Sequence, residues 1–354
     1  MAKAPKKTAA KKAKTTAKKA ASKATVKKTV AKKATTQAKK AVAKKATTQA
    51  KKAVAKKAAP KKAKQKKSAA KSSKKVTGYG GGGVDVVMSV DQVAKEAASI
   101  AANAPMHKEL LKLAGNDPLL TIKDLRAGYG KMEILHDFTL EIKKGQSLCL
   151  IGPNGAGKST VLHSIFGFTN IFSGKISIGG KDVTNLTPSQ KLAEAGIAYI
   201  LQDKSVFPQM TVEENLLMGG FLKNKPLEAK AAAEMVFDKY SRLAERRDKP
   251  AGVLSGGERR LLEISRALVM NPEVLLVDEP SIGLEPRFID MVFEILADLQ
   301  HRDGKTIIMV EQNAKKGLSF ADIGYVLVSG ETAIAGKGDD LLQNPDVGRL
   351  FLGG

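Results

Sequence analysis

The 354-residue chain has no tryptophan and only one cysteine, Cys149. One thiol cannot form a disulfide within the chain, which excludes a disulfide-stapled fold and fits a reducing compartment. No stretch approaches the roughly 18 consecutive apolar residues that a membrane-spanning helix needs. The N-terminus also lacks the apolar centre of a secretory signal peptide. We therefore expect a soluble protein, whose work at any membrane would need a separate membrane partner.

The first 76 residues contain no arginine and no acidic residue, yet they hold 29 lysines. The whole chain has 60 basic and 35 acidic residues. The other 278 residues therefore keep 31 basic groups against 35 acidic groups, a net charge of −4. The positive excess belongs to the N-terminal segment alone, so the two parts of the chain need separate interpretations.

This N-terminal segment, the basic tail (residues 1–76), contains a repeat: KKATTQAKKAVA at 32–43 recurs unchanged at 44–55. The repeat offers almost nothing to an apolar core and its lysines repel one another, so we expect the tail to be disordered. Its composition resembles the lysine- and alanine-rich tails of linker histones and bacterial histone-like proteins. The resemblance implies contact with the phosphates of nucleic acid rather than its bases. Attraction to anionic lipid, a solvated appendage and an upstream stretch absent from the mature protein stay open as alternatives.

Three segments are predicted from these changes in composition. TGYGGGG at 77–83 is typical of a flexible linker. Short helices are expected after it, the second over 106–115, before a turn that ends at Pro118. The predicted boundaries are 1–76 for the disordered tail, 77–118 for the glycine linker and short helices, and 119–354 for the domain that carries the chemistry.

The motif GPNGAGKST follows an apolar strand pattern and precedes a helical pattern. The surrounding elements are predicted as strands at 119–125, 134–142 and 147–152, and as a helix at 159–168. A glycine-rich turn between a strand and a helix is the context of a phosphate-binding loop, because its N–H groups and the helix N-terminus both favour an anion. We assign nucleotide binding to the whole motif: Gly152, Pro153, Asn154, Gly155, Ala156, Gly157, Lys158, Ser159 and Thr160.

Four side chains of this loop and of a second motif suggest the chemistry. Lys158 can reach the β- and γ-phosphates of a nucleotide, and the Ser159 hydroxyl can ligate Mg²⁺. The second motif, NPEVLLVDEPS at 271–281, is an apolar strand that ends in acids. Asp278 can hold Mg²⁺ through a water, and Glu279 can polarise the water that attacks the γ-phosphate. ATP and Mg²⁺ are the predicted cofactors, and ATP hydrolysis is the predicted reaction.

Between the two motifs lies LSGGERR at 254–260, followed by a helical pattern. Ser255, Gly256 and Gly257 at a helix N-terminus would form a second anion site, which makes sense if it binds the nucleotide of a neighbouring subunit. With these motifs, the chain resembles the ATP-binding-cassette (ABC) family over roughly 119–353. The resemblance implies an α/β P-loop NTPase fold, in which a parallel-sheet core carries an antiparallel β subdomain and a helical subdomain.

The resemblance also implies roles for side chains outside these motifs. Tyr129, in AGYGKMEIL, stands where the family stacks an aromatic ring on adenine. Gln202, in AYILQDKSVFPQMTVEENL, matches the glutamine that contacts Mg²⁺ and senses the transport partner. Phe207 in the same stretch lies in the region that is similar to the family's docking site for membrane subunits.

Gln312 stands where most members of the family have a histidine that contacts the γ-phosphate. A glutamine amide can donate a hydrogen bond but cannot take up a proton near neutral pH. We place Gln312 with Glu279 and Gln202 in the predicted catalytic set. The EQN variant, together with GYGKMEILH, MTVEENLLMGG and the terminal FLGG, resembles the branched-chain amino-acid uptake branch.

Two functions compete at this point. The first is the ATP-hydrolysing subunit of an ABC importer for branched-chain or other amino acids, held peripherally at the cytoplasmic face of the inner (plasma) membrane. Its partners would be permease membrane subunits and a second ATPase, in a homodimer or in a heterodimer with a paralogue. The alternative is a soluble ABC ATPase that acts on, or is anchored to, nucleic acid through the basic tail. The alternative draws on the tail alone, since the rest of the chain has no basic excess.

The division of charge makes a testable prediction. A chain shortened to begin at Leu119 should keep ATP binding and basal hydrolysis but lose DNA affinity, whereas the full-length chain should bind duplexes of any sequence. If ~10 lysines contact phosphates, the log of the affinity should fall against the log of the salt concentration with a slope near −9. Fluorescence anisotropy on two unrelated duplexes across a salt series measures both, with anionic vesicles in parallel. Equal DNA binding by the two chains would contradict the prediction.

Overall fold

The computed structural model describes residues 112–115, 117–202 and 205–352. The predictions for the basic tail, the glycine linker and the helices before residue 112 lie outside the described residues. Residues 112–114 are helical, in agreement with the end of the helix expected over 106–115.

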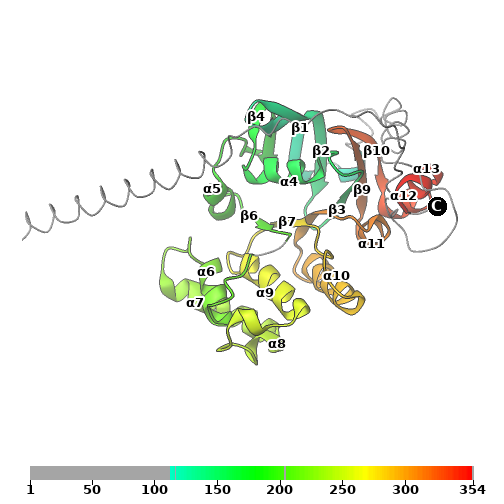
Figure 1. The fold of residues 1–354 in the computed structure, drawn as a ribbon. Coiled ribbons are helices and arrows are strands. Elements are labelled where there is room, and N and C mark those ends of the chain that lie inside the picture. The colour runs from blue at the N-terminus through cyan, green and yellow to red at the C-terminus, as the bar shows by residue number, and fades with distance from the viewer. Residues whose placement is uncertain (1–111, 116, 203–204, 353–354) are drawn as a thin grey trace, which may run out of the picture. The chain divides into compact units, whose positions relative to one another are not determined.

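A six-stranded sheet forms the centre of the described chain, in the order β10-β9-β3-β8-β7-β6 (Figure 1). Five of its strands pair in parallel, and β10 pairs antiparallel with β9. The strands are β3 (Ser147–Ile151), β6 (Ile197–Ile200), β7 (Val274–Asp278), β8 (Thr306–Val310), β9 (Ile323–Val328) and β10 (Glu331–Lys337). Every residue of β3, β7, β8 and β9 is buried, as is typical of parallel strands covered on both faces. Cys149 on β3 is one of these buried residues.

A second sheet of four antiparallel strands has the order β2-β1-β4-β5. Its strands are β1 (Pro118–Tyr129), β2 (Met132–Lys143), β4 (Asn170–Ile178) and β5 (Lys181–Asp182). A two-residue turn joins β1 to β2, with Tyr129 paired to Met132. The strands predicted at 119–125 and 134–142 are confirmed, but both are longer than expected. β1 pairs with β2 on one side and β4 on the other, and this pairing extends the strand past its apolar run.

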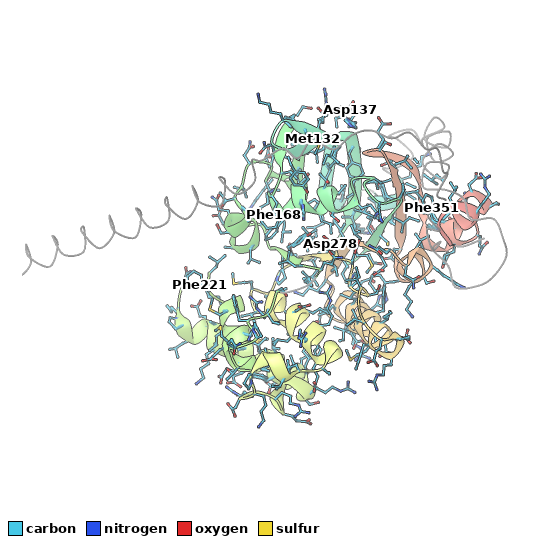
Figure 2. The ribbon with its side chains drawn as sticks, in the orientation of Figure 1. Met132, Asp137, Phe168, Phe221, Asp278 and Phe351 are labelled. Atoms are coloured by element: carbon cyan, nitrogen blue, oxygen red, sulfur yellow. The ribbon has the colours of Figure 1, made fainter. Side chains whose placement is uncertain are left out.

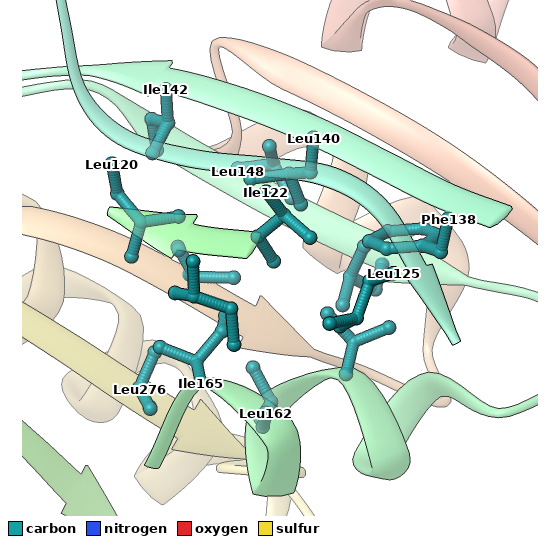
Figure 3. Close-up of a cluster of buried hydrophobic side chains, with 14 of the residues drawn as sticks. Leu120, Ile122, Leu125, Phe138, Leu140, Ile142, Leu148, Leu162, Ile165 and Leu276 are labelled. Atoms are coloured by element: carbon teal, nitrogen blue, oxygen red, sulfur yellow. The ribbon is translucent and has the colours of Figure 1, made fainter. Parts of the chain in front are cut away.

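Helix α4 (Lys158–Phe166) packs with both sheets in one apolar core. In Figure 3, Leu162 and Ile165 of this helix lie with Leu276 of the six-stranded sheet and Leu120 of the four-stranded sheet. The helix ends at Phe166, two residues before the predicted end. Gly167 adopts a φ of +93° and caps the helix there, a conformation that glycine adopts without steric cost.

Two further groups of helices complete the described fold (Figure 1). The first packs on the other face of the six-stranded sheet, with α10 (Pro286–His301), α11 (Ala314–Phe320), α12 (Gly338–Leu342), α13 (Pro345–Val347) and η2 (Gly348–Leu352). The second builds its own apolar cluster, with α6 (Val212–Gly219), α7 (Pro226–Lys239), α8 (Ser241–Ala244), η1 (Ala251–Val253) and α9 (Gly256–Leu268). The predicted combination of a parallel core, an antiparallel β subdomain and a helical subdomain is therefore confirmed. Within the described residues, none of the helices has the length and apolar character to span a membrane.

The short helix α5 (Pro188–Ala193) buries a lysine completely. The Lys191 ammonium donates a hydrogen bond to the backbone oxygen of Ser164, 3.2 Å away near the C-terminus of α4. Carbonyl groups at a helix C-terminus carry partial negative charge, so they favour a cation. Removal of the ammonium group from water nevertheless has the larger effect on its pKa. It lowers the pKa of Lys191 to about 8.

Lys191 predicts a specific pH dependence of stability. Below about pH 8, the amine is protonated in both the folded and the unfolded chain. From about pH 8 to its ordinary pKa of 10.5, the unfolded chain keeps a proton that the folded chain has released. The free energy of unfolding should therefore rise with pH across this window relative to that of Lys191→Met. Urea unfolding of both proteins at pH 7, 8, 9 and 10 measures the difference, and a constant difference would contradict the prediction.

Candidate functional site

The predicted phosphate loop lies between β3 and α4, and its curvature depends on glycine. Gly152 has a φ of +144°. A Cβ at this position would lie 2.2 Å from the backbone oxygen of Leu327 on β9. Gly157 is the N-cap of α4 with a φ of +98°, and a Cβ there would lie 3.0 Å from a side-chain carbon of Leu135. A side chain at Gly152 would strike the backbone of β9, and the positive φ of Gly157 favours glycine there, so the loop can curl closely at the helix N-terminus.

Lys158 places its ammonium group inside this curl. Its Nζ donates hydrogen bonds to the backbone oxygens of Gly152 at 2.9 Å and Pro153 at 3.0 Å. Burial lowers the pKa of Lys158, while the carboxylates of Glu279 and Asp278 act in the opposite direction. The loop thus holds a positive group that faces the two acids at the end of β7, which β8 separates from β3. A nucleotide phosphate is predicted to bind beside them.

Ser159 and Asp278 are brought into contact by α4 and β7. The Ser159 hydroxyl donates a hydrogen bond to Asp278 Oδ1 at 3.2 Å. Figure 2 shows Asp278 between the sheets and the helical cluster of α6 to α9. A hydroxyl beside a carboxylate suits Mg²⁺, which prefers oxygen ligands and usually takes the rest from phosphates and water. The described part of the chain contains no cluster of three or more His, Cys, Asp or Glu that could hold a metal alone. These two residues therefore fit a Mg²⁺ ion that arrives with a nucleotide.

Glu279 follows Asp278 with a backbone φ of +43°, an uncommon value for a residue with a side chain. The strain is held in place because the Glu279 N–H donates to the backbone oxygen of Val310 on β8 at 2.9 Å. Gln202 Nε2 donates to Glu279 Oε2 at 2.6 Å. Gln312 Nε2 lies 3.0 Å from both Glu279 oxygens. The structure thus brings together the three predicted catalytic side chains.

Tyr129 lies at the end of β1, beside the helix that begins at the phosphate loop. Its hydroxyl is hydrogen-bonded to Nδ1 of His163 on α4. The two rings meet edge to face with their centroids 6.0 Å apart. Tyr129 is 38% exposed, so part of the residue remains accessible to solvent. Its role in adenine stacking stays a prediction.

The second predicted anion site lies at the start of α9. Ser255 is the N-cap, and it exchanges hydrogen bonds with Glu258 in a capping box. Ser255 and Gly256 are exposed, whereas Gly257 packs so closely that a Cβ would lie 2.3 Å from the Phe288 ring. No hydrogen bond found among the described residues joins this turn to the phosphate loop. The assignment of Ser255, Gly256 and Gly257 to the nucleotide of a neighbouring subunit stays a prediction.

Arg260 is a linking residue that the sequence analysis missed. It is only 4% exposed, and its Nη1 donates to the backbone oxygen of Leu201 at 2.7 Å and to Glu263 Oε2 at 2.8 Å. Its Nη2 lies 3.5 Å from the backbone oxygen of Asp278. One guanidinium therefore connects α9 with the ends of β6 and β7. Its position on the inward face of an amphipathic helix, three residues before Glu263, is the signal that could have revealed it.

Comparisons with known proteins agree with this geometry. Residues 135–282 match the ABC transporter family. The chain is 42% identical to the high-affinity branched-chain amino acid transport ATP-binding protein BraG of Pseudomonas aeruginosa, over 67% of this chain and 100% of that protein. It is 39% identical to a probable branched-chain amino acid transport ATP-binding protein, LivF, of Archaeoglobus fulgidus, over 66% of this chain and 98% of that protein. A crystal structure of the ADP conformation of MJ1267, an ATP-binding cassette of an ABC transporter, superposes with a TM-score of 0.60. It is 29% identical and covers 68% of this chain and 100% of that one.

The contact between Gln312 and Glu279 predicts the effect of substitutions at Gln312. Gln312→Ala should slow ATP hydrolysis by about 10- to 100-fold, because a hydrogen bond to a charged group is lost. Gln312→His should keep a donor, and its rate should gain an inflection near pH ~6–7 that the glutamine enzyme lacks. Steady-state phosphate release between pH 5.5 and 9 measures both effects. Gln343→Ala, at an exposed glutamine on the C-terminal side of α12, is the matched control. Unchanged turnover in Gln312→Ala would remove Gln312 from the site.

Proposed function

Because the chain belongs to the ATP-binding-cassette family of ATPases, we propose that it is the ATP-hydrolysing subunit of an ABC importer for branched-chain or other amino acids. The observation that carries the proposal is the carboxylate of Glu279, which two amides hold beside the phosphate loop. The names of the two relatives described above favour branched-chain amino acids as the solute.

The site supports hydrolysis by in-line attack of water on the γ-phosphate. The loop backbone and the Lys158 ammonium would hold the phosphates and offset their charge. Ser159 and Asp278 would hold Mg²⁺, which when bound would supply positive charge that offsets the charge of the phosphates. Glu279 would orient the attacking water and accept its proton. Gln202 and Gln312 keep the Glu279 carboxylate in one orientation, which reduces the reorganisation that the reaction requires.

A second cassette would complete the nucleotide site. The exposed N-terminus of α9 offers Ser255, Gly256 and the helix dipole to a phosphate from outside the chain. We infer a dimer in which two nucleotides lie between the phosphate loop of one subunit and this turn of the other. The partner would be a second copy of this chain or a paralogous ATPase.

The helical cluster of α6 to α9 presents aromatic side chains for a permease partner. Phe207 is 42% exposed and Phe221, labelled in Figure 2, is 78% exposed. The backbone of Phe207 is held by Asn215, whose side chain accepts from its N–H at 2.8 Å and donates to its oxygen at 3.0 Å. Exposed aromatic side chains of this kind would suit an apolar surface on a membrane subunit. Docking there would place the protein peripherally at the cytoplasmic face of the inner membrane.

A second function rests on the 29 lysines of the basic tail. Under this proposal the tail would bind nucleic acid, or anionic lipid beside the permease, without base recognition. The named relatives are transport ATPases, which favours the first function for the rest of the chain.

The role of Glu279 predicts separate effects on binding and on hydrolysis. Glu279→Gln should keep ATP binding but lower the rate of hydrolysis by roughly two orders of magnitude or more, since a positioned base is lost. This variant should accumulate as an ATP-bound dimer, which size-exclusion chromatography with ATP detects. Lys158→Ala should weaken nucleotide binding itself. Glu331→Gln, at an exposed glutamate on β10, is the matched control.

Transport is tested in the source cell with the same substitution. Cells in which Glu279→Gln replaces the natural chain should lose uptake of labelled leucine, isoleucine or valine, while cells with Glu331→Gln should keep it. Hydrolysis at the wild-type rate by purified Glu279→Gln would contradict the catalytic assignment. Loss of hydrolysis with unchanged amino-acid uptake would contradict the assigned solutes.

A further inference from the structure

Tyr199 makes a contact with the proposed metal site that the function above does not use. It lies on β6, where it pairs with Leu276 on β7, two residues before Asp278. Its hydroxyl donates a hydrogen bond to Asp278 Oδ2 at 2.7 Å. The other oxygen, Oδ1, accepts from the Ser159 hydroxyl at 3.2 Å. The two oxygens of Asp278 therefore have separate partners, one on the edge strand and one on the helix that follows the phosphate loop.

The Tyr199 ring is itself held by other rings. Its centroid lies 5.5 Å from that of Phe166, 5.7 Å from that of His163 and 5.9 Å from that of Phe168. Phe166 and His163 belong to α4, and Phe168 follows that helix directly. Such contacts between rings leave the phenol little freedom to turn. The rings of α4 and Phe168 therefore help to fix the position from which the Tyr199 hydroxyl contacts Asp278.

A fixed donor on one oxygen has a direct effect on an aspartate. The terminal torsion of Asp is broad, so an isolated carboxylate samples a wide range of orientations about its last bond. A hydrogen bond at Oδ2 restricts that rotation and leaves Oδ1 directed at Ser159. A phenol hydroxyl carries its own proton near neutral pH, so Tyr199 donates to this carboxylate.

We propose that Tyr199 is a positioning residue for the metal: its hydroxyl holds the Asp278 carboxylate in the orientation that binds Mg²⁺ together with ATP. Tyr199 would not touch the metal or the nucleotide. The inference rests on the proposed function of Asp278 and Ser159. Outer partners that orient metal-binding carboxylates commonly change metal affinity by 10- to 100-fold when they are removed.

The test is Tyr199→Phe in the full-length protein, which keeps the ring and removes only the hydroxyl. The affinity for a fluorescent ATP analogue is measured across a Mg²⁺ titration and in EDTA. In EDTA, the variant should bind the analogue as the wild type does. The Mg²⁺ concentration that gives half of the metal-dependent gain in affinity should rise by about tenfold. Electron paramagnetic resonance of Mn²⁺ with ATP gives a second reading of metal binding, and the variant should leave more of the metal free.

Two further variants separate positioning from a structural role. Tyr240→Phe is the matched control, because the Tyr240 hydroxyl is buried and has no hydrogen-bond partner within the described part of the chain. It should leave the Mg²⁺ titration unchanged. Tyr199→Phe added to Asp278→Asn should cause no further change in metal dependence, because Tyr199 acts through that carboxylate.

The outcomes distinguish this inference from the proposed function. A wild-type protein whose nucleotide affinity does not depend on Mg²⁺ would contradict the metal site itself, and the inference with it. A normal wild-type titration that Tyr199→Phe reproduces would overturn the inference alone. Equal weakening of nucleotide binding in EDTA and in Mg²⁺ would also overturn it, since that result indicates a structural effect of the hydroxyl.

Discussion

The parallel pairing of β3, β8, β7 and β6 determines where the chemistry of this protein can occur. These strands lie side by side in that order and run in one direction, so their carboxyl ends meet at one edge of the sheet. In the same order, Gly152 follows β3, Gln312 lies two residues after β8, Asp278 is the last residue of β7, and Gln202 lies two residues after β6. Glu279, which follows β7, therefore stands between β8 and β6, each of which is followed two residues later by a glutamine. The hydrogen bonds that it accepts from both sides follow from the strand order rather than from any local motif.

The same strand order explains why the predicted phosphate loop needs glycine where it leaves β3. β3 is flanked by β8 and β9, and the chain must leave it without striking either neighbour. The backbone of Gly152 passes the Leu327 oxygen of β9 too closely for any side chain. The loop then curls around Lys158, whose ammonium donates hydrogen bonds to the backbone oxygens of Gly152 and Pro153. Backbone packing and charge thus act on the same few residues of the loop.

Short motifs in the sequence predict part of the candidate site. The phosphate loop and the acids at 278 and 279 were predicted because they stand next to apolar strand patterns within one short stretch of the sequence. The order of the strands was not predicted, and the combination of a parallel core with a β and a helical subdomain was implied only by the resemblance to a family. Arg260, Lys191 and Tyr199 were missed because their importance depends on burial and on partners distant in the chain. The end of α4 was misjudged by two residues, since the left-handed conformation of Gly167 outweighs the apolar residues around it.

The hydrogen bonds between the Asn215 side chain and the Phe207 backbone have a consequence for any partner that docks on the helical cluster. A long side chain that must be immobilised at an interface costs about 0.5–1.5 kcal/mol in lost conformational entropy. Phe207 is restrained in advance, because Asn215 ties its backbone and the Arg266 guanidinium lies 5.0 Å from its ring centroid. A partner would therefore meet a stiff contact instead of a compliant one. Stiffness at this point would let a small rotation of the helices push a neighbouring protein, where a loose ring would simply yield.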